Sequence, residues 1–307
     1  MSSHPRIPHA VLMAILITAA ACSSERSQPS APAGLAATGS QQQTSVAGAE
    51  VPDPVVPASS VSAVARAEVT YEEAEAAYTA GRYNDAVVMF NAYTDRKPAN
   101  VWGEYMLGLS SWKAGDPERA IGAFDRALAI DSTHEKSLLN SSRVLIEQKR
   151  TEDALDRIAR VLSIDSLDNE ALRLQARAYH NQGDTEAAIK GYLSALRANE
   201  RDVWSLNNLG LIYLEIGDAE RALPPLARAV ELRDNAPVFR NNLGIALERT
   251  GHPVAARDQY RAALEVDSTY RKAAVSLERV TPIAESAPPD SVDLGMKASE
   301  FVMVIRT

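Results

Sequence analysis

Five glycines that recur at a fixed interval constrain the fold more than any other feature of this sequence. They are Gly81, Gly115, Gly183, Gly217 and Gly251, so the successive spacings are 34, 68, 34 and 34. The stretch NNLGLIYLEIG, which ends at the fourth glycine, returns at the same spacing as NNLGIALERTG, which ends at the fifth. A period of this length indicates that one small supersecondary unit is stacked several times. The sequence therefore predicts an elongated array.

Six consecutive units of this length fit between residues 67 and 270 without an insertion. They are 67–100, 101–134, 135–168, 169–202, 203–236 and 237–270. Positions 8, 20 and 27 of the unit hold Ala, Gly or Ser in 16 of 18 cases, which indicates closely packed helices. The glycine at position 15 can end a first helix, because it tolerates the positive φ of a helix C-terminal turn. Each unit is therefore predicted to be a pair of helices.

This pattern resembles the tetratricopeptide repeat (TPR) family, whose 34-residue unit places Leu-Gly near positions 7–8 and Ala at positions 20 and 27. The resemblance implies an all-α fold, a right-handed α-α superhelix (solenoid) of six repeats. Residues 271–280 would form a capping helix that ends before Pro282, because a terminal unit needs its outer face covered. We expect the tail, residues 281–307, to be disordered. The alternative is a segment that adds to a partner or folds back into the groove.

Two units depart from the repeat pattern. Unit 3 has Lys149 in place of the glycine, and Ser141-Ser142 in place of Leu-Gly. Unit 5 has Pro224 and Pro225 inside its second helix, where a proline loses a helical hydrogen bond and clashes with the preceding turn. We therefore expect that helix to begin late or to kink.

The N-terminal region has the pattern of an exported, lipid-anchored protein. Residues 10–21 are an apolar run too short to span a bilayer but typical of a signal peptide, so 1–21 is predicted to be one. The run ends at Cys22, the only cysteine, and resembles the lipobox of bacterial lipoproteins. Residues 22–66 are then a lipidated cysteine and a flexible linker rich in Ser, Ala and Pro. The alternative is a cut after the Ala-x-Ala of residues 19–21, which leaves a free thiol.

The first helix of each unit lines the concave groove in this family, chiefly at positions 2, 5, 6, 9, 12 and 13. Three asparagines share position 6, where an amide can donate to and accept from a peptide backbone. Two arginines four residues apart can grip a carboxylate, and two aromatic residues can serve as anchors. The candidate peptide-binding residues are Trp102, Tyr105, Asn140, Arg143, Arg173, Arg177, Asn208 and Asn242. The alternative is that these residues are ordinary features of the repeat.

No pattern of residues indicates catalysis or a bound cofactor. The histidines of the array, His134, His180 and His252, lie in different units, and none has the spacing to a second ligand that a metal site needs. The sequence has no nucleophile elbow, no Gly-rich phosphate loop and no HExxH motif. A net charge of −8 disfavours nucleic acid as a partner. We therefore expect no enzyme activity, no cofactor or metal, and no small-molecule substrate.

Together these features predict a non-catalytic lipoprotein scaffold that binds a peptide segment or a partner protein in its groove. Because no Asp follows Cys22, the anchor resembles those of outer-membrane lipoproteins, so the array would sit in the bacterial envelope and face the periplasm. Three alternatives share this architecture. They are a pilus or secretin assembly factor, an adaptor for a periplasmic peptidase, and a subunit that positions substrate for an enzyme, as in cytochrome maturation.

Overall fold

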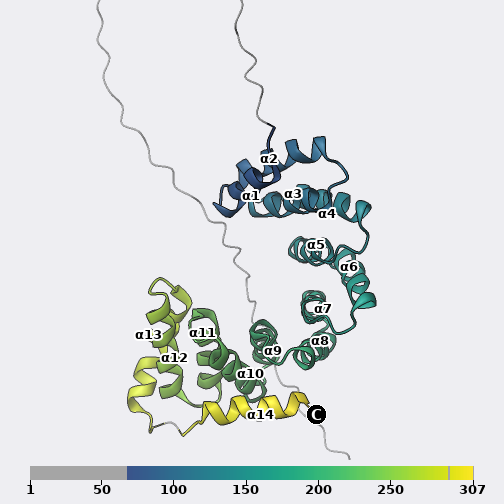
Figure 1. Ribbon diagram of the computed structural model, residues 1–307. Coiled ribbons are helices and arrows are strands. Elements are labelled where there is room, and N and C mark those ends of the chain that lie inside the picture. Colours follow the sequence, from purple (N-terminus) through teal and green to yellow (C-terminus); the bar gives the residue numbers. More distant parts are fainter. Residues whose placement is uncertain (1–67, 290, 307) are drawn as a thin grey trace, which may run out of the picture. The chain divides into compact units, whose positions relative to one another are not determined.

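The computed structural model describes residues 68–289 and 291–306, and in that part of the chain every regular element is an α-helix (Figure 1). Six helix pairs come first. Their first helices are α1 (Tyr71–Thr79), α3 (Val101–Lys113), α5 (Glu135–Glu147), α7 (Asn169–Gln182), α9 (Val203–Glu215) and α11 (Pro237–Arg249). Their second helices are α2 (Tyr83–Arg96), α4 (Pro117–Ile130), α6 (Thr151–Ile164), α8 (Thr185–Ala198), α10 (Ala219–Leu232) and α12 (Pro253–Val266). Two further helices follow, α13 (Arg271–Ser286) and α14 (Leu294–Arg306).

The helix pairs keep the register of the sequence repeat. The second helices begin at residues 83, 117, 151, 185, 219 and 253, and these starts are separated by the same interval as the glycines. From α1 to α13 each helix packs on the next, and several successive first helices also pack on one another, most closely α5 on α7. The predicted all-α solenoid is therefore confirmed. None of the helices in the described part of the chain is both long and apolar enough to cross a membrane.

The Leu-Gly of the repeat is explained by close packing between the two helices of a unit. A Cβ on Gly210 would lie 2.4 Å from Leu226 Cγ, and one on Gly244 would lie 2.5 Å from Tyr260 Cε1. Since real Cβ atoms do not approach other heavy atoms so closely, only glycine fits opposite these large side chains without a shift of the helices. This half of the NNLG stretch therefore belongs to the fold.

The buried side chains form two hydrophobic cores that meet at α7. The N-terminal core extends from α1 to α7 and includes Leu174 and Ala178 of α7. The C-terminal core includes Ala176 of α7 and continues through α8–α13 to α14. Opposite sides of α7 thus belong to different cores, and the N-terminal core and C-terminal core are treated separately below.

The two prolines of α10 do not delay the helix, so the expected late start is wrong. The helix begins at Ala219, in register with the others, and contains both Pro224 and Pro225. The missing N–H groups would have bonded the carbonyls of Glu220 and Arg221, four residues earlier. Both of those residues are exposed, although Pro225 itself is buried.

The capping helix is longer than expected. Helix α13 continues through Pro282 to Ser286 instead of ending before the proline. Pro282 is exposed, and so is Glu278, whose carbonyl loses its helical partner. The helix can therefore continue because the unpaired carbonyl lies on its solvent side.

The C-terminal tail is neither disordered nor placed along the first helices. Residues 294–306 form α14, which packs on the second helices α10 and α8 and buries Ala298, Phe301 and Ile305 (Figure 1). At its end, the Nε and Nη2 atoms of Arg306 donate to the two carboxylate oxygens of Glu200 at 2.7 and 2.6 Å. Position 25 gives no unique sequence signal for this docking, because α10 has Ala227 there but α6 has Ala159 and α8 has Leu193.

Three other second helices, α2, α4 and α12, have polar residues at that position, namely Asn91, Asp125 and Arg261. With Ala219, Leu223 and Val230 also buried, α10 carries an apolar outer side. That side requires a cover, and α14 supplies it.

Candidate functional site

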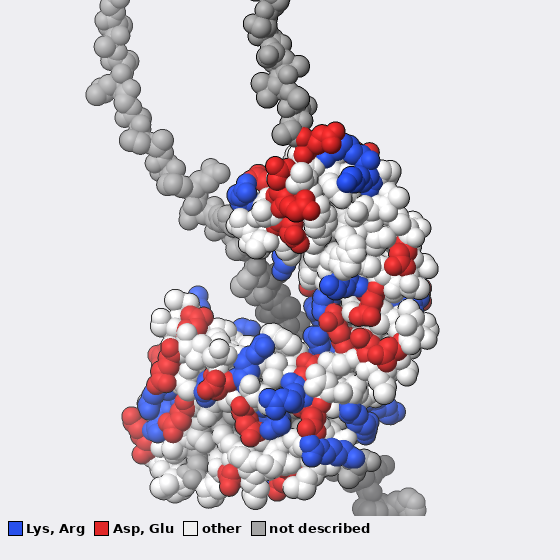
Figure 2. All heavy atoms as spheres, viewed as in Figure 1, with Lys and Arg blue, Asp and Glu red and all other residues white. Residues whose placement is uncertain are grey.

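The candidate site is the side of the array lined by the first helices at positions 2, 5, 6, 9, 12 and 13, called the first-helix face below. Its charge is uneven. Acidic side chains, among them Glu72 and Glu75, gather over α1, whereas cationic and acidic side chains alternate over α5 and α7 (Figure 2). The residues predicted to bind a peptide lie on α3, α5, α7, α9 and α11 of this face.

Trp102 and Tyr105 belong to one aromatic cluster at the α3–α5 junction, but they differ in exposure. The Trp102 ring is edge-on to His134, with centroids 4.9 Å apart, and Lys136 Nζ lies 5.0 Å from the Trp102 ring centroid. Trp102 is 47% exposed and Tyr105 only 8%. Burial raises the pKa of Tyr105, so its hydroxyl stays protonated. Trp102 is therefore the available anchor, and Tyr105 mainly packs.

Asn140 and Arg143 on α5 form a connected polar pair with their neighbours. Asn140 Nδ2 donates to the Tyr105 hydroxyl at 3.2 Å, while Asn140 Oδ1 accepts from Arg143 Nη1 at 2.7 Å. Arg143 also forms an ion pair with Glu170 of α7. Burial lowers the pKa of Arg143, with Glu170 opposing the shift, yet the guanidinium stays charged at neutral pH. Both side chains are partly exposed and held in fixed orientations.

The structure separates Arg173 from Arg177, which were predicted to grip one carboxylate together. Arg173 Nε lies 3.1 Å from Oδ2 of Asp202, a side chain that is only 7% exposed and also accepts from Ser205. Arg177 Nη2 lies 3.8 Å from Glu147 Oε1, near the limit of an ion pair, and 39% of the Arg177 side chain is exposed. Arg173 is thus occupied by the α8–α9 junction, whereas Arg177 is loosely paired.

The asparagines of the NNLG copies form a chain of hydrogen bonds between α9 and α11. Asn242 Nδ2 donates to Asn207 Oδ1 at 2.8 Å, and Asn208 Nδ2 donates to the Tyr192 hydroxyl at 3.3 Å. Burial raises the pKa of Tyr192 to about 12, so the hydroxyl remains a neutral acceptor and donor. Asn242 is only 6% exposed, whereas Asn208 is half-buried.

Asn208 is therefore partly accessible on the first-helix face, whereas Asn242 is almost fully buried. The Asn242 amide links α11 to α9 because a buried amide needs partners inside the protein. Peptide binding by these residues stays a prediction.

Several residues of this face have no counterpart in the sequence prediction. Glu147, Glu170 and Asp202 pair with the three arginines, and Lys149 lines a cleft beside Arg177. The acidic partners lie at unit boundaries or in neighbouring units, so their pairing depends on stacking that a linear pattern does not specify. Lys149 could have been singled out from the sequence, because it replaces the glycine that the other five units have at position 15.

The described residues contain no group of three or more His, Cys, Asp or Glu side chains that could hold a metal ion. Cys22, the predicted lipidation site, lies outside the part of the chain that the structure describes.

Family comparisons agree with the repeat register. Profiles described as tetratricopeptide repeat match residues 71–135, 207–274 and 111–178, and one described as TPR repeat matches 176–217. Together the matched segments cover residues 71 to 274 without a gap. The chain belongs to the tetratricopeptide repeat family. A search of curated protein sequences gives no significant match.

Solved structures of other TPR proteins share the fold. The thermophilic TPR protein TTC0263 of Thermus thermophilus is 21% identical, with a TM-score of 0.50, over 60% of this chain and 100% of its own. A TPR protein of Parabacteroides merdae is 12% identical, with a TM-score of 0.57, over 68% of this chain and 82% of its own. The APC/C hetero-tetramer Cut9-Hcn1 matches at 16% identity, with a TM-score of 0.58, over 67% of this chain and 41% of its own. At these identities the likeness concerns the fold, and the TPR fold is typical of scaffolds for protein or peptide interaction.

Proposed function

We propose that this TPR protein is a non-catalytic scaffold that binds an extended segment of a partner protein along its first-helix face. The observation that supports this most directly is the fixed orientation of partly exposed polar groups on that face. Asn140 is held by Arg143 and Tyr105, and Asn208 is held by Tyr192. Groups that are already oriented lose little entropy on binding, so they suit recognition of a flexible segment.

In this proposal the residues have different roles. Trp102 supplies exposed apolar area, and Asn140 and Asn208 bond the ligand backbone with the amide capacity that their internal bonds leave free. Asn242 supports the face by joining α11 to α9 instead of touching the ligand. The proposal therefore predicts that substitutions at Asn208 and at Asn242 have different consequences.

We further propose that the array is tethered to a membrane of the bacterial envelope through a lipidated Cys22. The apolar run before the only cysteine supports this, as does the low-complexity linker after it. Two or more acyl chains would suffice for stable anchoring. Replacing Cys22 by Ala should move the protein from the membrane fraction to the soluble periplasmic fraction and abolish incorporation of labelled palmitate. Retention of Cys22→Ala in membranes would contradict the anchor without affecting the groove.

The groove is tested by crosslinking in intact envelopes, identification of the crosslinked partner, and measurement of its affinity for purified protein. Asn140→Ala combined with Asn208→Ala should weaken binding at least about tenfold, the effect of losing roughly one to two net hydrogen bonds. Asn84→Ala is the matched control, because Asn84 is an exposed asparagine at the start of α2, away from this face. Equal affinities of the double variant and the control would remove the backbone-contact proposal.

A further inference from the structure

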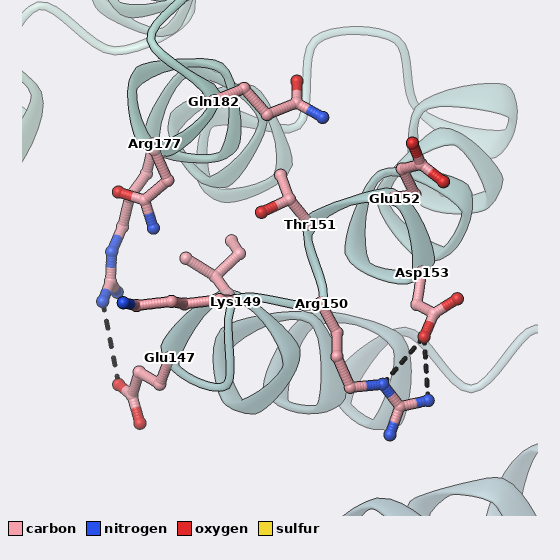
Figure 3. A pocket seen from close by; sticks show the side chains of 10 residues that line it. Glu147, Lys149, Arg150, Thr151, Glu152, Asp153, Arg177 and Gln182 are labelled. Carbon is pink, nitrogen blue, oxygen red and sulfur yellow. Dashed lines mark hydrogen bonds and ion pairs between the residues drawn. The ribbon is translucent and has the colours of Figure 1, made fainter.

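A cleft opens beside the first-helix face where unit 3 meets unit 4. It has a volume of about 890 Å³ and lies between the turn that joins α5 to α6 and the C-terminal end of α7. Figure 3 shows Lys149 extending from that turn in the direction of Arg177, and both side chains line the cleft. The cleft thus combines two cations from neighbouring units.

Lys149 adopts a backbone conformation that the rest of the array assigns to glycine. Its φ is +60°, and the five equivalent positions are glycines with φ between +74° and +87°. In the described residues it is the only non-glycine residue with positive φ. A lysine in the left-handed region is strained because its Cβ crowds the backbone, and such strain concentrates at functional sites. The fold would therefore accept a glycine here more readily than a lysine.

The cations of the cleft are poorly neutralised by the protein itself. No ion pair is recorded for Lys149 within the described residues, and Arg177 reaches Glu147 only at 3.8 Å. Glu147 is already engaged, since its other carboxylate oxygen accepts from Trp112 Nε1 at 3.0 Å. The remaining arginine of the cleft, Arg150, is neutralised by a close ion pair, because its Nη2 lies 2.8 Å from Asp153 Oδ2.

Neutral donors complete the cleft. Thr151, Asn181 and Gln182 line it, and the described residues provide no recorded hydrogen-bond partner for any of their side chains. The opposing charges are Asp153, which is paired with Arg150, and Glu152, which lies beside it on α6, across the cleft from Lys149 and Arg177 (Figure 3). The cleft thus holds three cations and three acids, but among the described residues Lys149 has no ion pair and Arg177 only the long contact to Glu147, so these two cations are the least neutralised.

We propose that this cleft binds a carboxylate of the partner segment, with Lys149 and Arg177 as its cationic contacts. The proposal rests on the function proposed above and specifies the chemistry of the partner. A ligand carboxylate would approach Arg177 more closely than Glu147 does, and Lys149 would contribute the second positive charge. The carboxylate is either a chain terminus or an Asp or Glu side chain. Arg173 takes no part, because Asp202 occupies it.

The test uses arrays of random dodecapeptides printed in three matched forms, probed with the purified protein from residue 22 onward. One form carries Asp or Glu with an amidated C-terminus, one carries Asn or Gln with a free C-terminus, and one has neither carboxylate. We expect one of the first two forms to be preferred over the third, which identifies the source of the carboxylate. That preference should fall at least about tenfold in Lys149→Gly and in Arg177→Gln, as expected for loss of a charged hydrogen bond.

Lys149→Arg should retain the preference, because it keeps the charge. Lys190→Gln is the matched control, since Lys190 is an exposed lysine of α8 paired with Glu186. Lys149→Gly should also be at least as stable as the wild type, so lost binding cannot be attributed to unfolding. Equal binding of all three peptide forms, or a preference that survives Lys149→Gly combined with Arg177→Gln, would overturn the proposal. Binding of the form without carboxylates that depends on Asn140 and Asn208 would leave the general groove function intact.

Discussion

The N-terminal core and the C-terminal core are built from the same repeat, but within the described residues only the C-terminal core has an additional helix on its second helices. In the N-terminal core, α6 buries Ala154, Ile158 and Val161 and leaves its outer side to solvent. In the C-terminal core, α10 buries eight residues because α14 covers its outer side. The same unit can thus be a plain solenoid repeat or a platform for a distant segment.

The first-helix faces of the two cores differ as well. The N-terminal core and α7 present charged pairs between helices, such as Arg143 with Glu170, together with the strained Lys149. The C-terminal core adds neutral amides, with Asn242 bonded to Asn207, beside charged pairs such as Arg279 with Glu248. We infer that contacts within the N-terminal core are mostly local in sequence. The Arg306–Glu200 contact spans 106 residues and links the C-terminal core into a larger cooperative unit.

The largest effect is expected when the additional helix loses its main apolar contact. Phe301→Ala should destabilise the C-terminal core by about 3 kcal/mol, because it leaves a cavity under α14. Helix-resolved hydrogen exchange should show lost protection in α10 and α14 and little change in α1–α5. Met303→Ala is the control, since Met303 is 64% exposed, and it should change stability by less than about 0.5 kcal/mol. Equal loss in both cores would show that the array unfolds as one unit.

The asparagines provide the second comparison. Asn242→Ala should cost about 1–3 kcal/mol in unfolding free energy, because the buried Asn207 carbonyl oxygen loses its donor. Asn140→Ala, at the same repeat position in the N-terminal core, should cost less than about 1 kcal/mol, since its partner Arg143 is partly exposed and can bond water instead. Urea denaturation of both variants measures the difference. Similar losses at the two positions would mean that burial does not distinguish them.

Position 15 allows a reciprocal exchange between units 3 and 4. Lys149→Gly should stabilise the protein by about 1 kcal/mol by relieving a left-handed lysine, and Gly183→Lys should destabilise it by a similar amount. A Cβ on Gly183 would meet nothing within 4 Å, so the cost there is conformational and not steric. Thermal unfolding of the two variants checks the opposite signs. A Lys149→Gly protein less stable than the wild type would indicate that the lysine side chain makes a stabilising contact.

The smallest effect concerns acid sensitivity of the C-terminal core. The hydrogen bond from Arg306 lowers the pKa of Glu200 below its ordinary value of 4.5. A carboxylate with a lowered folded-state pKa stabilises the fold above pH 4.5, and this contribution is lost as the pH falls through the lowered pKa. Protection of α14 amides should therefore weaken below about pH 4.5. Glu200→Gln should flatten this pH dependence, and an unchanged profile would exclude Glu200 as its source.

Much of the fold could be predicted because its determinants are periodic in the sequence. Ala, Gly and Ser at three positions of the unit fix the distance between paired helices, and a glycine at position 15 fixes the turn. The prolines misled the prediction. A proline removes one helical hydrogen bond, yet α10 continues through Pro224 and Pro225 and α13 through Pro282, and in each case the residue four positions earlier is exposed. Whether that earlier residue faces solvent is not visible in a linear pattern.

The sequence predicted where the candidate site residues lie, but not which of them are already bonded to other residues of the protein. The register places Arg173, Arg177, Asn208 and Asn242 on the first helices, as the structure does. Which of them is free depends on residues from other units, such as Asn207 beside Asn242, or from the boundary with the next unit, such as Asp202 beside Arg173. Those pairings arise only when the units stack at their final angles.

The sequence by itself determined the repeat, its register and the family, because each depends on interactions inside a single repeat unit. Only the tertiary structure decided that α14 docks on α10, that Asn242 is internal, and that Lys149 and Arg177 end beside one cleft. Each of these joins residues from different units or from distant parts of the chain. Their proximity is set by helix packing between units, which local sequence spacing does not encode.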